Sequence, residues 1–190
     1  MRKIVSKKEQ EKKIKRNQWV VGIVLVFLML FSVLGYAFGG KSDGENEKVT
    51  YNEFEFLGQN GFWYTQIGNF EFVFDYNPKE VDEQKVELNY VNEYYEKPLY
   101  LSSENSKASS EIYNNLNRFV LRMQNACTED QKCGGDLPVK TCEDNFIIIK
   151  KSNETKLYQD ENCVFIEAPE DKLVGLTDEF LFQILGIREQ

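Results

Sequence analysis

Residues 54–76, FEFLGQNGFWYTQIGNFEFVFDY, carry the pattern that decides the fold of this chain. Phe54 and Phe56 alternate with glutamates, and every second residue from Phe70 to Tyr76 is aromatic. A period of two predicts strands that are apolar on one face. The dipeptides Asn60-Gly61 and Gly68-Asn69 separate these runs, and both suit tight hairpin turns. We therefore predict a meander of three strands, near residues 50–58, 62–67 and 70–76.

The chain after this meander is expected to hold both strands and helices. Residues 98–102 (PLYLS) read as a short apolar strand, and apolar side chains from Ile112 to Cys127 recur at helical spacing, which predicts a helix over 108–126. Two β-rich runs follow, at 145–151 and 156–167, and the polar residues between them favour a hairpin. Residues 81–96 fit either strand and loop or a poorly formed helix.

The last element is expected to be a helix near the end of the sequence. Thr177 is its predicted N-cap, two acidic residues follow in the first turn, and Gly186 is expected to end it. Together these elements predict an α+β fold, a β-meander followed by β-α-β-β-α. Packing their apolar faces together gives a mostly antiparallel sheet with two helices on one face.

A long apolar run precedes this domain. Trp19 to Phe38 are twenty positions without a charged side chain, close to the roughly 20 residues that a helix needs to cross a bilayer. Residues 1–17 hold eight basic and two acidic residues, so the amino terminus is expected in the cytoplasm. A cleavable signal peptide is the alternative, with Gly35 and Ala37 as its small-x-small site, but the length of the run favours a retained anchor.

These features divide the chain into four parts. We predict a basic cytoplasmic tail (1–17), a transmembrane helix (18–38), a flexible tether (39–48) and one extracytoplasmic domain (49–190) of about 140 residues, a common size for a single domain. The chain has 23 basic and 31 acidic residues, and those after residue 17 number 15 and 29, a formal charge of about −14. Such a charge repels nucleic acid.

The four cysteines lie in the second half of the chain. Disulfides persist outside the cytoplasm, and local geometry favours Cys127 with Cys133 and Cys142 with Cys163. Two alternatives stay open. A four-thiolate zinc site lacks the two close pairs of ribbon-type sites, and a thiol-disulfide oxidoreductase would place a C-x-x-C pair at a helix start.

The chain contains no histidine, which excludes Ser-His-Asp and Cys-His catalysis and imidazole metal ligands. Carboxylate pairs for glycosidase-like hydrolysis remain, and the candidates are Glu53, Glu55, Glu71 and Asp75. Their alternation with aromatic residues favours the solvated face of a sheet instead. No phosphate-binding glycine motif or EF-hand loop occurs, so we predict no cofactor and no metal.

Phe62, Trp63 and Tyr64 are consecutive in the middle strand, so at least one ring must lie on each face of the sheet. Exposed aromatic residues mark binding surfaces, and we predict one here unless the 81–96 segment covers that face. Asn153 begins an N-x-T sequon, a site for glycosylation where the cell performs it.

Taken together, these observations predict a single-pass membrane protein rather than an enzyme. Its acidic, disulfide-stabilised domain would bind or scaffold another protein of the cell envelope. The first alternative is a membrane-anchored thiol-disulfide oxidoreductase, and the second is a carboxylate-dependent hydrolase of surface polymers.

Overall fold

The computed structural model describes residues 17–31, 47–129 and 136–189, which belong to two compact units, Met1–Glu45 and Asn46–Gln190. In the first unit, residues 17–31 form a helix with exposed side chains. Among the residues described, no helix combines the length and the hydropathy that crossing a bilayer requires. The rest of the predicted span, most of the basic tail and most of the tether lie outside the described residues.

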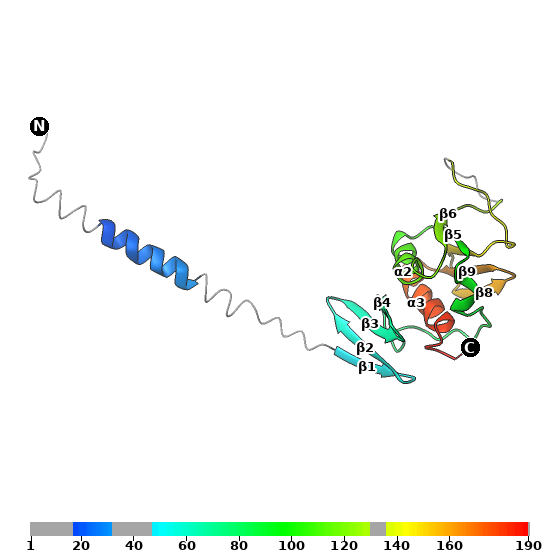
Figure 1. Cartoon of the computed structure of the whole chain (residues 1–190), viewed down its shortest axis with the longest axis horizontal. Coiled ribbons are helices and arrows are strands. Elements are labelled where there is room, and N and C mark those ends of the chain that lie inside the picture. Colours follow the sequence, from blue (N-terminus) through cyan, green and yellow to red (C-terminus); the bar gives the residue numbers. More distant parts are fainter. Residues whose placement is uncertain (1–16, 32–46, 130–135, 190) are drawn as a thin grey trace, which may run out of the picture. The chain divides into compact units, whose positions relative to one another are not determined.

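The second unit begins with a four-stranded antiparallel meander (Figure 1). Its strands are β1 (Glu47–Tyr51), β2 (Phe54–Gln59), β3 (Phe62–Ile67) and β4 (Phe70–Phe74). The predicted turn at Asn60-Gly61 is confirmed, because both residues have positive φ angles, 54° and 81°. The prediction of a single strand near residues 50–58 is wrong, because two strands occupy this part of the chain. Asn52 and Glu53, with φ of 42° and 69°, form a further tight turn and divide it into β1 and β2.

A second, five-stranded sheet has the order β6-β5-β7-β9-β8. Its strands are β5 (Pro98–Ser103), β6 (Arg122–Asn125), β7 (Phe146–Lys151), β8 (Lys156–Asp160) and β9 (Cys163–Ala168). All neighbours pair in parallel except β8 with β9. The prediction of a mostly antiparallel sheet therefore holds for the meander and is wrong for this sheet. The predicted hairpin is also wrong, since β7 pairs with β9 in parallel and the 156–167 run is itself the hairpin β8-β9.

The predicted helix over 108–126 is shorter than expected and is followed by a strand. Helix α2 spans Ser106–Leu116, and Asn105 caps its start by accepting hydrogen bonds from the backbone of Lys107 and Ala108. The chain then turns and enters β6, which runs parallel to β5. Phe119 and Val120, just before β6, are types that strands favour.

Helix α3 spans Leu173–Ile184 and starts earlier than predicted. Thr177 is not its N-cap, because it lies inside the helix and donates its hydroxyl to the carbonyl oxygen of Leu173 at 2.8 Å. The predicted end is confirmed. Gly186 has a φ of 72°, and the amides of Gly186 and Ile187 bond the carbonyls of Gln183 and Phe182, which is a Schellman ending.

The two helices form a layer between the sheets (Figure 1). Helix α2 contacts β4 and β5, and α3 contacts β9. On its other side, the α3 residue Phe182 packs against Phe56 and Phe74 of the meander, with ring centroids 5.9 and 4.7 Å apart. Residues from all three layers join one apolar core. Because α3 packs against other elements on several sides, almost every one of its side chains is buried.

Residues 81–96 cross from the meander to the second sheet mostly without regular structure. Their regular part is a 3-10 helix, η1 (Val91–Tyr94), so the segment is neither a strand nor an α-helix. Leu88 and Tyr94 are buried in the main core. The segment is thus fixed by its apolar side chains rather than by backbone ladders.

Candidate functional site

The outer face of the meander, opposite the helices, carries a row of partly exposed apolar side chains. Leu57 lies opposite Tyr64, and Tyr64 lies opposite Val73 on the next strand. Leu57 is 43% exposed, while Tyr64 and Val73 are half-buried. Phe62 is on the same face as Tyr64, two residues earlier in β3, and is 40% exposed. We call Leu57, Phe62, Tyr64 and Val73 the outer row.

Carboxylates lie beside the outer row. Glu55 and Glu71 share its face of the sheet, because each lies two residues from a member of the row. A shallow groove of 550 Å³ is lined by both glutamates, by Glu53, by Leu57 and Tyr64 of the row, and by five further residues that include Phe54, Gln66 and Ile67; Phe62 and Val73 do not line it. Lys48 forms an ion pair with Glu55. The groove therefore combines an apolar floor with an acidic margin.

The three consecutive aromatic residues are divided between the two faces. Trp63 is only 7% exposed and joins the core, whereas Phe62 and Tyr64 lie on the outer face. The Trp63 ring lies over β2 beside Gly58, where an added Cβ would approach it to 3.2 Å. A larger residue at position 58 would require the indole and Glu47, which is equally close, to shift by a few tenths of an ångström.

The four carboxylates that the sequence offered for hydrolysis do not form one site. Glu53 lies in the β1-β2 turn, and Glu55 and Glu71 lie on the outer face. Asp75 follows β4 and is buried, with its side chain 8% exposed and Oδ1 2.9 Å from the Lys107 Nζ. The acids that do come together are Asp75 and two that the sequence did not single out, Glu111 of α2 and Asp178 of α3.

These three acids are enclosed between the end of β4 and the two helices. Glu111 is 4% exposed and Asp178 is fully buried. The side chain of Glu111 adjoins those of Asp178 and Asp75, and Asp178 Oδ2 accepts the backbone N–H of Tyr76 at 2.9 Å. Burial raises the pKa of Glu111 to about 7, with the charge of Asp75 as a second cause. Burial raises the pKa of Asp178 well above its usual value, and the charge of Glu111 adds to this.

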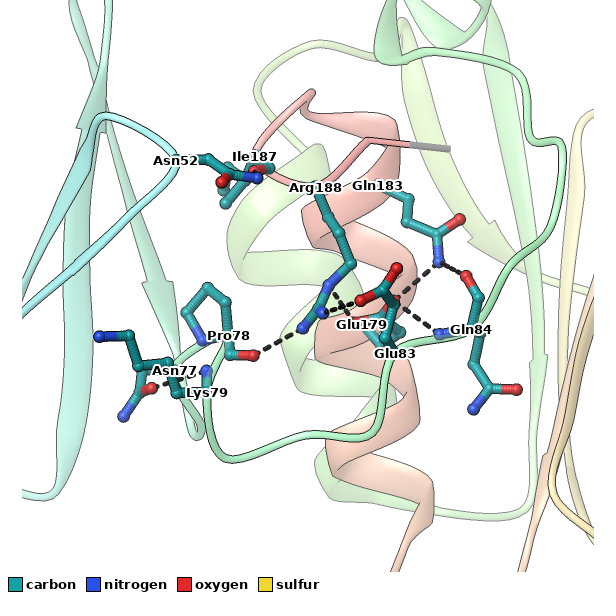
Figure 2. A network of polar contacts seen from close by, with 10 residues as sticks. All are labelled: Asn52, Asn77, Pro78, Lys79, Glu83, Gln84, Glu179, Gln183, Ile187 and Arg188. Carbon is teal, nitrogen blue, oxygen red and sulfur yellow. Dashed lines mark hydrogen bonds and ion pairs between the residues drawn. The ribbon is translucent and has the colours of Figure 1, made fainter.

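A second buried polar group ties residues 77–84 to α3 (Figure 2). Arg188 is 5% exposed, and its Nε lies 2.9 Å from Glu179 Oε2 while Nη2 donates to the carbonyl oxygen of Pro78 at 2.6 Å. Gln84 has its backbone N–H bonded by Glu179 and its carbonyl bonded by Gln183. Side chains of α3 thus replace the backbone partners that this irregular segment lacks. The pKa of Glu179 is raised, mainly by burial.

Cys142 and Cys163 form the second of the two predicted disulfides, with their Cα atoms 4.9 Å apart. The pairing is as predicted, but it does not arise from the predicted hairpin, because Cys163 lies opposite Phe146 in the parallel pair of β7 with β9. Cys163 is 1% exposed, which is typical of structural bridges rather than exchanging ones. The predicted pairing of Cys127 stays a prediction, because Cys133 lies outside the described residues. Asn153 is exposed in the connection between β7 and β8.

A cleft of 190 Å³ lies at the start of α3, where Gly175 faces Val81 and Tyr76. Glu80, Asp82, Asp171 and Lys172 also line it. Within the parts of the chain that the structure describes, no three acidic or cysteine side chains are placed to hold a metal ion. No protein-family model, curated protein or solved structure matched the chain.

Proposed function

We propose that this chain is a single-pass membrane protein that displays its domain outside the cytoplasm and binds a cationic segment of another envelope protein through the outer face of the meander. The observation that carries the proposal is the outer row with its acidic margin. Leu57 and Phe62 are about two-fifths exposed on the face of the meander that points away from α2 and α3. The proposed anchor is the uncharged run from Trp19 to Phe38.

Charge decides the chemistry of the proposed partner. Residues after position 17 carry a formal charge of about −14, and Glu53, Glu55 and Glu71 surround the groove. Two copies of such a domain repel each other, whereas a basic partner is attracted and steered to it. An apolar floor with an acidic margin suits a segment that alternates lysine or arginine with apolar side chains.

The test uses a photoreactive amino acid at single positions of the full-length chain in intact cells. Phe62 and Tyr64 are the positions on the outer face, and Tyr95, which is 56% exposed elsewhere, is the matched aromatic control. We expect one discrete cross-linked product from the outer-face positions, with a basic peptide at the attachment point. Equal labelling at Tyr95, or an acidic attachment point, would contradict the proposal.

A second experiment tests the membrane orientation separately. Single cysteines introduced in the exposed turn at residues 153–155 and in the tail before residue 17 are treated with a membrane-impermeant thiol reagent. We expect labelling of the turn in intact cells and of the tail only after lysis. Labelling of the tail in intact cells would show the opposite orientation, with the amino terminus outside the cytoplasm. That result would not test whether the outer face of the meander binds a partner.

A further inference from the structure

Three carboxyl groups and one amine meet at the junction of the meander with the helices. Asp75 leaves the end of β4, Lys107 and Glu111 lie one turn apart on α2, and Asp178 comes from α3. Lys107 pairs with Asp75 at 2.9 Å. This single amine cannot neutralise three carboxylates, and the other two acids are at most 4% exposed. Unpaired buried carboxylates are too costly to persist as anions.

Some buried carboxyl oxygens of this group lack hydrogen-bond donors within the described part of the chain. One oxygen of each acid, Oδ2 of Asp75, Oε2 of Glu111 and Oδ1 of Asp178, is buried without a donor among the N–H and hydroxyl groups of the described residues. Glu111 adjoins both aspartates, since it lies one turn from Lys107, which pairs with Asp75, and Asp178 bonds the residue after Asp75. Two ionised carboxylates cannot form a hydrogen bond, since both are acceptors only. A carboxyl proton in each of these two contacts would supply the donors that the buried oxygens lack.

We propose that a protonated Asp178 donates a hydrogen bond to Glu111, that a protonated Glu111 donates one to Asp75, and that this chain of hydrogen bonds, closed by Lys107, is a pH-sensitive joint between the meander and the helix layer. Asp75 is the last acceptor of the chain because its Oδ1 already pairs with the Lys107 amine. Asp178 is the outermost donor because its Oδ2 is already occupied by the Tyr76 N–H. The joint is independent of what binds to the outer face.

The charged and titratable groups around the joint come from three elements. Asp75 and Tyr76 face it from the end of β4, Lys107 from α2 and Asp178 from α3. The pKa of Glu111 is higher in the folded protein than in the unfolded chain, so the fold binds protons more tightly. The stability that the joint contributes is complete at acidic pH and is lost as the pH rises through about 7.

The first test is infrared spectroscopy of the full-length protein in detergent micelles, titrated from about pH 5 to about pH 9. A protonated carboxyl group has a carbonyl stretching band that a carboxylate lacks. We expect such a band to lose intensity near neutral pH in the wild type and to lose less in Glu111→Gln. Absence of any titrating carboxyl band above about pH 5, or an equal loss in Glu111→Gln, would overturn the proposal.

The second test compares urea unfolding of the same proteins at both ends of the pH range. Glu111→Gln keeps both hydrogen bonds, because an amide can accept from Asp178 and donate to Asp75 without a titrating proton. Between about pH 5 and about pH 8, the unfolding equilibrium constant of the wild type should rise on the order of 10²-fold more than that of Glu111→Gln. Glu179 is present in both proteins, so its contribution to the pH dependence of unfolding cancels in the comparison. Glu87→Gln, at an exposed position, is the control and should behave as wild type; equal pH dependence in wild type and Glu111→Gln would contradict the joint.

Discussion

The side-chain amide of Asn115 bonds both backbone groups of Val73, accepting its N–H at 3.0 Å and donating to its carbonyl at 2.7 Å. Val73 lies in β4, an edge strand of the meander, so Asn115 occupies the place of a further strand. Arg118, one turn further along the chain, donates to the carbonyl oxygen of Glu71 in the same strand. These side chains close an edge that would otherwise invite pairing with other chains.

Asn115→Ala is expected to destabilise the protein by about 2–4 kcal/mol, because it leaves two partly buried backbone groups of Val73 without partners. The reopened edge should also make the protein aggregate more readily. Urea unfolding and light scattering measure the two effects. The neighbouring residue Asn114 is exposed, and Asn114→Ala is the matched control. Similar behaviour of the two variants would show that the edge is not closed in this way.

Arg188→Ala is expected to cost about 3–5 kcal/mol, since it leaves the carboxylate of Glu179 buried without its cation. The pKa of Glu179, already raised by burial, should rise further, so the carboxyl can take up a proton as the pH falls. The deficit should therefore shrink at acidic pH. Unfolding free energies at several pH values measure this. Glu83→Ala removes the half-exposed acid of the same network and should cost less than about 1 kcal/mol.

Removing the Cys142–Cys163 bridge by a double alanine substitution is expected to lower stability by about 3 kcal/mol, because the bridge closes a loop of 21 residues in the unfolded chain. Thermal unfolding of wild type and variant without reductant gives the difference. Adding reductant should bring the wild type toward the variant. An unchanged unfolding temperature would mean that the packing around Cys163 alone holds these strands.

Glu53→Gly is expected to stabilise the protein by about 0.5–1 kcal/mol. Glu53 has a φ of 69°, a conformation that glycine adopts freely and that costs other residues about 1–2 kcal/mol, offset in part by the greater entropy of unfolded glycine. The matched control is Glu55→Gly, two positions later within β2, which should destabilise. Equal losses in both variants would show that the turn is not strained.

The strands and turns of the meander could be predicted because both are encoded locally. The alternating aromatic residues predict β2, β3 and β4, and the dipeptides Asn60-Gly61 and Gly68-Asn69 predict the two turns between them. The turn at Asn52-Glu53 was missed because glutamate is a rare choice where φ is positive. The end of α2 at Leu116 was missed because apolar residues beyond it happen to continue the helical spacing.

Long-range pairing and the buried acids were beyond reach of the sequence alone. Nothing near residues 145–168 distinguishes a hairpin of β7 with β8 from the parallel pair of β7 with β9, because the choice depends on β5 taking the other side of β7. Glu111 and Asp178 look like solvent-facing helix residues until α2 and α3 are placed against β4. A helix with both sides covered cannot be recognised from one apolar stripe.

The position of α3 in the chain also governs how the domain is made. The meander is synthesised first, yet the helix that covers its inner face is encoded about 100 residues later, an interval of roughly 5 to 20 s at ordinary rates of translation. During that time Phe56 and Phe74 have no Phe182 to pack against. The domain therefore completes its folding late, and the cell must keep the growing chain from associating with its neighbours until residue 184 has emerged.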